Sequence, residues 1–139
     1  MKILFLGSRP DSIFFYKNLN KNHIVYVLKT SEINKWYYND INNLKEVKFI
    51  EKSKLKNINF NIGISYNYNK KIKNDLLKIP LKGFINIHYS YNLKIRGRNI
   101  MFYSIYKNLL DTGFSFHWMN ENIDSGKIIY SEKILPDHN

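Results

Sequence analysis

The feature that most constrains the fold is a short apolar run that ends in a glycine turn and leads into a helical pattern. Residues 2–6 form the run, Gly7 opens the turn, and residues 12–19 have helical spacing. A buried strand, a tight turn and a helix in this order are typical of the start of a parallel α/β sheet. A second apolar run, residues 23–28, repeats the strand signal. The sequence therefore predicts an α/β fold.

The rest of the chain continues this alternation, and the last two strands are expected to be antiparallel partners. The further predicted strands cover residues 47–50, 58–66, 83–88, 113–118 and 127–135. One further helix is predicted at residues 70–77, with its last turn at 75–79 before Pro80, and another at residues 99–110. Residues 30–44 mix helix and loop, and Trp36, Tyr37 and Tyr38 are expected to pack in a core or an interface. Together these patterns indicate a Rossmann-like twisted, mostly parallel sheet with helices on both faces.

The composition fits one folded domain, so we expect residues 1–139 to form a single domain. Of the 139 residues, 44% are hydrophobic and 16% aromatic, which argues against a disordered chain. Cysteine is absent, which excludes disulfides and thiolate metal sites. No apolar run approaches the ~20 residues that span a bilayer, and the apolar start is too short for a signal peptide. We therefore expect a cytoplasmic protein. The histidines lack metal-ligand spacing, so no metal is expected; they are His23, His88, His117 and His138.

The net charge of +11 raises the question of nucleic-acid binding. The excess is almost entirely lysine, scattered among Asn, Ile and Tyr, whereas nucleic-acid footprints use clustered Arg and Lys. An AT-rich coding sequence explains the same enrichment. The charge therefore does not favour nucleic acid as the partner, but it would attract an anionic small molecule.

Three polar residues have the chemistry of acyl transfer to an amine. Asn86 and His88 alternate with Ile85 and Ile87 on one apolar strand, so their side chains share a face. Asp124 lies in an Asp-Ser-Gly turn that can direct its carboxylate inward. Amide and imidazole donors can stabilise the oxyanion, and a carboxylate can accept the proton of the amine or orient the histidine. The alternative is that His88 is a structural residue.

The turn after the first strand is a candidate substrate-binding site. Gly7, Ser8 and Arg9 precede a predicted helix, whose N-terminal N–H groups can bind a phosphate. The alternative is that Gly7 only permits the turn while Asp11 or Ser12 caps the helix.

Several ordered blocks resemble the folate-dependent formyltransferase family, whose pattern reads roughly INxHxSLLPxYRG, then TGVTxH, then DxG. The blocks are FNIGISY at 60–66, INIHYS at 85–90, RG at 96–97, TGFSFH at 112–117 and IDSG at 123–126. The resemblance implies the formyltransferase fold, a catalytic trio of Asn86, His88 and Asp124, and 10-formyltetrahydrofolate as the formyl donor. His117 would be structural. The match departs from the pattern at Tyr89 and at residues 92–94, in the loop over the folate.

Within this family, the sequence most resembles the sugar N-formyltransferases, which implies a nucleotide-linked amino-sugar as acceptor. It also implies a set of folate-binding positions, namely Ser65, Tyr66, Asn67, Tyr68, Asn120, Ile123 and Ser125. Methionyl-tRNA formyltransferase and glycinamide ribonucleotide transformylase are alternatives, and a non-catalytic basic binding remnant of the fold is another. We expect the chain to lack the family's usual C-terminal extension and to form a homodimer through residues 127–134, because an edge strand favours pairing.

Overall fold

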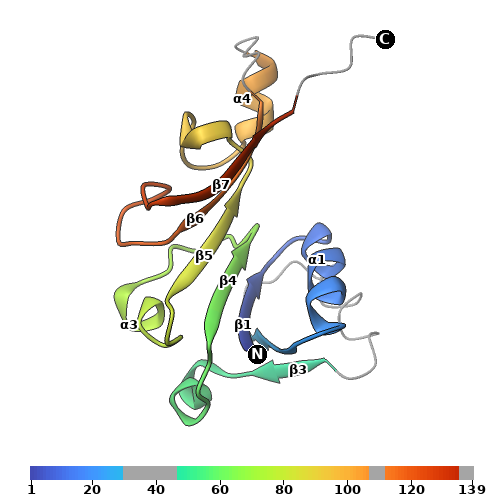
Figure 1. The fold of residues 1–139 in the computed structure, drawn as a ribbon, viewed down its shortest axis with the longest axis vertical. Coiled ribbons are helices and arrows are strands. Elements are labelled where there is room, and N and C mark those ends of the chain that lie inside the picture. Colours follow the sequence, from blue (N-terminus) through green and yellow to red (C-terminus); the bar gives the residue numbers. More distant parts are fainter. Residues whose placement is uncertain (30–46, 107–111, 135–139) are drawn as a thin grey trace. The chain divides into compact units, whose positions relative to one another are not determined.

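The computed structural model describes residues 1–29, 47–106 and 112–134 (Figure 1). The chain divides into two compact units, Met1–Phe84 and Ile85–Asn139, and each is described by itself. The mixed helix and loop predicted at residues 30–44, with Trp36, Tyr37 and Tyr38, lies outside the described residues. So does the end of the helix predicted at residues 99–110.

The first unit contains four parallel strands in the order β3-β2-β1-β4. Its elements are β1 (Lys2–Gly7), α1 (Asp11–Asn20), β2 (Ile24–Leu28), β3 (Lys48–Ile50), η1 (Lys52–Asn57), β4 (Ile62–Tyr66) and α3 (Asn74–Leu77). The central strand β1 is buried from Ile3 onward, as expected for a strand covered on both faces. Gly7 pairs with Tyr66, so the loops after β1 and β4 leave the sheet side by side.

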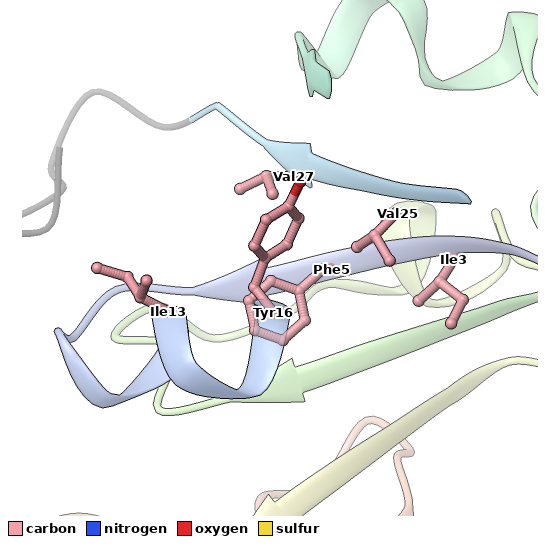
Figure 2. Packing of buried hydrophobic residues seen from close by; sticks show 6 residues of the cluster. All are labelled: Ile3, Phe5, Ile13, Tyr16, Val25 and Val27. Atoms are coloured by element: carbon pink, nitrogen blue, oxygen red, sulfur yellow. The ribbon is translucent and has the colours of Figure 1, made fainter. Parts of the chain in front are cut away.

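The main core of the first unit forms between the sheet and α1. Ile3, Phe5, Val25 and Val27 come from the strands, and Figure 2 shows Tyr16 of α1 packing over Phe5. The rings of Phe5 and Tyr16 lie 6.3 Å apart. Burying each aliphatic or aromatic side chain of this kind contributes about 1.5–3 kcal/mol. This core therefore fixes the start of α1 against the end of β1.

The second unit is an antiparallel arrangement in which β6 lies between β5 and β7. Its elements are β5 (Phe84–His88), which begins at the last residue of the first unit, η2 (Tyr91–Leu93), α4 (Ile100–Tyr106), β6 (Gly113–Trp118) and β7 (Ile128–Lys133). In this register Asn86 is opposite His117 and His88 is opposite Ser115. The pairing therefore brings polar residues of β5 and β6 together.

The predicted α/β class with mostly parallel strand pairing is confirmed, and the differences are local. The strand predicted at residues 58–66 begins only at Ile62, because the carbonyls of Phe60 and Asn61 accept hydrogen bonds from Leu81 and Lys82. The helix predicted at residues 70–77 is limited to α3, because Lys73 is extended and Ile72 is buried from an irregular segment. The sequence did not predict the short helices η1 and η2.

Candidate active site

The strand β5 presents Asn86 and His88 on the same face. Ile87, between them, is buried on the other face, as the alternation predicts. His88 is buried and Asn86 is half-buried. His88, the last residue of β5, lies close to the loop that follows the strand, because its Nε2 is 2.8 Å from the Ile95 carbonyl oxygen.

Asp124 is held by the loop that joins β6 to β7. The N–H of Trp118 donates to the carbonyl of Lys127, which closes the base of this loop at 2.9 Å. A side chain at Gly126 would place its Cβ 1.6 Å from the Trp118 carbonyl oxygen, so only glycine fits. Within the loop, Asn120 Oδ1 accepts hydrogen bonds from the Asn122 N–H at 3.0 Å and the Ser125 hydroxyl at 2.9 Å. Asp124 adopts a φ of 46°, a left-handed conformation that aspartate tolerates. The loop is therefore tightly specified.

The three predicted catalytic residues converge within this unit. The Gly97 N–H donates to Asp124 Oδ2 at 2.8 Å, and His88 Nε2 lies 3.6 Å from the same oxygen. Asn86 Nδ2 donates to the other oxygen, Oδ1, at 3.3 Å. The carboxylate of Asp124 is therefore surrounded by hydrogen-bond donors.

A second histidine, His117, contacts the same carboxylate. Its Nε2 lies 3.6 Å from Asp124 Oδ1 and 3.2 Å from Asn86 Nδ2, and its side chain is almost fully buried. Sequence reasoning gave His117 only a structural role by resemblance. Its place opposite Asn86 in the β5–β6 register was the available signal, but it required knowing that these strands pair.

The neighbouring carbonyls assign the protons of both histidines, because a carbonyl only accepts hydrogen bonds. His88 Nε2 lies 2.8 Å from the Ile95 carbonyl oxygen, so Nε2 carries a proton. His117 Nδ1 lies 3.0 Å from the Trp118 carbonyl oxygen, so Nδ1 carries a proton and neutral His117 presents a lone pair on Nε2. Asn86 can then donate one amide hydrogen to this lone pair and the other to Asp124.

Two opposing effects set the pKa of Asp124. Burial raises this pKa, whereas the contact with His117, the Gly97 N–H that donates to the carboxylate, and the contact with His88 lower it. The lowering effects are larger, so the pKa of Asp124 lies below the usual carboxyl range. Asp124 is therefore ionised at neutral pH, which suits it to balance positive charge better than to store a proton.

The positions expected to bind folate lie in two loops. Ser65 is buried at the end of β4, and the Tyr66 ring stacks on Phe15 at 5.1 Å. Asn67 and Tyr68 follow and are half-buried. In the Asp124 loop, Asn120 and Ile123 are exposed and Ser125 is half-buried.

The loop after β1, expected to bind substrate, contains both buried and exposed groups. Gly7 is required by packing, because a Cβ there would lie 2.6 Å from Cβ of Ser12. Ser8 is buried and Arg9 is exposed. In the part of the chain that the structure covers, no group of three His, Cys, Asp or Glu residues is arranged to hold a metal ion. The described helices are also too short or too polar to cross a membrane.

Sequence comparison identifies the family. The profile of the formyl transferase family matches residues 2–138. The chain belongs to the formyl transferase family. The recognition made from the sequence blocks is therefore confirmed, and formyl transfer is the activity that this family's description names.

Individual relatives match over different lengths. GDP-perosamine N-formyltransferase of Brucella melitensis is 39% identical over 71 residues, which are 51% of this chain and 27% of that protein. The bifunctional polymyxin resistance protein ArnA of Wigglesworthia glossinidia brevipalpis is 34% identical over 95% of this chain and 19% of its own length. The chain thus spans about a fifth to a quarter of these curated relatives.

Solved structures of formyl transferases share the fold. A 4-N formyltransferase from Francisella tularensis has a TM-score of 0.75 and 25% identity, over 96% of this chain and 56% of that one. An N-formyltransferase from Helicobacter canadensis, solved in complex with folinic acid and dTDP-3-aminofucose, has a TM-score of 0.76 and 19% identity, over 99% of this chain and 54% of that one. The predicted formyltransferase fold is therefore confirmed.

Proposed function

We propose that this protein transfers a formyl group from 10-formyltetrahydrofolate to the primary amine of a nucleotide-linked amino-sugar. The observation that carries the proposal is the convergence of Asn86, His88 and Asp124 in one unit, with N–H donors around a carboxylate that stays ionised. Membership of the formyl transferase family supports the reaction. The GDP-perosamine relative and the aminofucose complex of the Helicobacter enzyme support the class of acceptor.

The donors of the site fit the needs of an acyl carbon. When bound, the folate donor would supply a formyl carbon whose oxygen gains negative charge as the amine adds. The Asn86 amide, and His88 Nε2–H once it turns from the Ile95 carbonyl to which it donates in this structure, are the N–H groups that can stabilise this charge. Asn86 would do so with the amide hydrogen that it donates to Asp124 at 3.3 Å, the longer of its two hydrogen bonds. This hydrogen would turn from Asp124 toward the formyl oxygen.

Asp124 has a different role from that of a strong base, because its pKa is lowered. The attacking nitrogen becomes positively charged as its bond to the formyl carbon forms. The Asp124 carboxylate stabilises that charge and holds His88 by their 3.6 Å contact. The nitrogen would then lose its proton to water, and the folate nitrogen that leaves the formyl carbon would take up a proton from water as that bond breaks.

The binding residues follow the same proposal. The candidate folate-binding residues of the first unit are Ser65 and Tyr66 at the end of β4 and Asn67 and Tyr68 after it. Those of the second unit are Asn120, Ile123 and Ser125 in the Asp124 loop. Gly7 and Ser8, through their backbone, and Arg9, as the exposed cation, would bind the phosphates of the acceptor. The net charge of +11 favours such an anionic acceptor. A homodimer and a cytoplasmic location belong to the same proposal.

Methionyl-tRNA is the second candidate acceptor. A methionyl-tRNA formyltransferase from Endomicrobium trichonymphae is 29% identical over 96% of this chain. We prefer the sugar because the relative with the highest identity among those named above acts on GDP-perosamine by its name.

The test is a formylation assay with the full chain. The protein is incubated with 10-formyltetrahydrofolate and a panel of nucleotide-linked amino-sugars, glycinamide ribonucleotide and methionyl-tRNA, and products are identified by mass spectrometry. We expect one amino-sugar to gain a formyl group, and His88→Asn to reduce the rate by about 100-fold or more. Formylation of the tRNA or of the ribonucleotide alone would change the acceptor. Binding of anions without any formylation would indicate a non-catalytic remnant and overturn the proposal.

A further inference from the structure

The loop after β1 and the loop after β4 are joined by side-chain hydrogen bonds. The Ser8 hydroxyl donates to the Asn67 carbonyl at 2.7 Å and accepts from the Asn69 N–H at 2.8 Å. Ser8 is only 4% exposed, and both roles of its hydroxyl are filled by this one loop. The side chain of Ser8 is therefore oriented toward the β4 loop, which we define as residues 66–69.

Two further residues hold the same loop. The fully buried Ser12 hydroxyl donates to the Tyr66 carbonyl at 3.2 Å. The Asn67 side-chain amide donates to the carboxylate of Asp11, the first residue of α1. Residues of the β4 loop thus form hydrogen bonds with one short segment, residues 8–12. This segment lies more than fifty positions earlier in the chain.

The backbone of the β4 loop turns at Asn67, which has a φ of 51°. This is the left-handed region, which asparagine adopts more readily than other residues with a side chain. The side chains of Ser8 and Asp11 fix this turn in one conformation. Asp11 binds the Asn67 side chain, and Ser8 binds the backbone on both sides of Tyr68.

We propose that Ser8 and Asp11 are positioning residues for the formyl donor, which shape the β4 loop without touching the ligand. This inference rests on the proposed function, in which Ser65–Tyr68 hold the folate. It assigns the side chain of Ser8 to the donor loop and leaves Arg9 as the group that meets the acceptor. Loss of either side chain should loosen the β4 loop and weaken donor binding, while the trio on β5 and in the Asp124 loop stays intact.

Asp11 provides the sharper test because it is exposed, so its replacement should not unfold the protein. Binding of folinic acid to the full chain is measured by calorimetry for Asp11→Ala and Asp11→Asn. Asparagine keeps an oxygen that can accept from Asn67, whereas alanine does not. We expect Asp11→Ala to raise Kd by about tenfold and Asp11→Asn to stay within about twofold of the wild type, the range of one hydrogen bond. Glu51→Ala, an exposed carboxylate elsewhere in the first unit, is the matched control.

Ser8→Ala and hydrogen exchange complete the experiment. Ser8→Ala should raise the KM for 10-formyltetrahydrofolate with kcat unchanged, which is the signature of a binding interaction. In Ser8→Ala and Asp11→Ala, the amides of residues 66–69 should exchange faster, with the core strands unchanged. If the wild type binds folinic acid and transfers formyl groups but these variants match it in Kd and KM, only the positioning role is overturned. If the wild type neither binds nor transfers, the proposed function fails and this inference fails with it.

Discussion

Replacing Asp124 by asparagine tests the site most directly, because the change is nearly isosteric. In the protein, the Gly97 N–H faces one oxygen of the Asp124 carboxylate and the Asn86 amide faces the other. His88 Nε2 also lies 3.6 Å from the first oxygen. An asparagine at position 124 must therefore direct its NH2 group at another donor, whichever way the amide is turned.

The expected size follows from these contacts. The variant keeps one of the two hydrogen bonds that the carboxylate accepts and loses the other together with the charge. A hydrogen bond to a charged group contributes about 1.5–3 kcal/mol, so the free energy of unfolding should fall by about this amount. For a domain of this size, each kcal/mol corresponds to about 4 °C in Tm. Formyl transfer should fall by about 100-fold or more, because the positive charge on the amine is no longer balanced.

The pH dependence gives an independent check. The pKa of Asp124 in the folded state is lowered, so its ionisation stabilises the protein above the usual carboxyl pKa of about 4. This stability should be lost as the pH falls through the lowered folded-state pKa. The difference between wild type and Asp124→Asn in chemical denaturation should therefore be full at neutral pH and shrink in acid. If Asp124→Asn matched the wild type in stability and in formyl transfer at neutral pH, the assignment of N–H donors around the Asp124 carboxylate would be refuted.

Three further predictions concern the same unit. His117→Asn should lower kcat by about five- to tenfold with the KM for the donor unchanged, because Asn86 loses a hydrogen-bond partner. Steady-state kinetics measure the effect, and the control His23→Asn should leave kcat unchanged. An unchanged kcat in His117→Asn would contradict this role of His117. Gly126→Ala should destabilise the protein by about 1–3 kcal/mol in thermal unfolding, because its Cβ would overlap the Trp118 carbonyl, and wild-type stability would disprove this packing. The apolar side chains of β7, Ile128, Ile129 and Tyr130, are 37–51% exposed, so light scattering should give a dimeric mass that Ile129→Lys reduces to a monomer; a monomeric wild type would exclude the dimer.

The sequence predicted the elements whose pattern is local. The apolar runs gave β1, β2 and β6 within one residue, because burial on both faces or strict alternation leaves a direct trace in the sequence. The short helices η1 and η2 were not predicted, since one turn of helix has no periodicity to detect. The helix before Pro80 was predicted too long, because burial of Ile72 from an irregular segment depends on contacts distant in sequence.

Part of the geometry of the candidate site was predictable from the sequence, whereas the roles of its residues stay predictions. The alternation on β5 correctly placed Asn86 and His88 on one face, and the Asp-Ser-Gly turn correctly suggested a carboxylate directed inward. The contact of His117 with Asp124 depends on strand register, and the bonds of Ser8 to the β4 loop join segments far apart in the chain. Neither has a local signature. Only a tertiary structure could show that Ser8 serves a different loop from its own.

The four polar side chains of the proposed centre, Asn86, His88, His117 and Asp124, all come from one continuous stretch of the second unit. A reaction centre encoded in one uninterrupted piece can be inherited, duplicated or recombined without separating its parts. Sequence changes outside that piece could then alter which amine is recognised while the chemistry is preserved. This offers an evolutionary route by which related chains would diversify their acceptors.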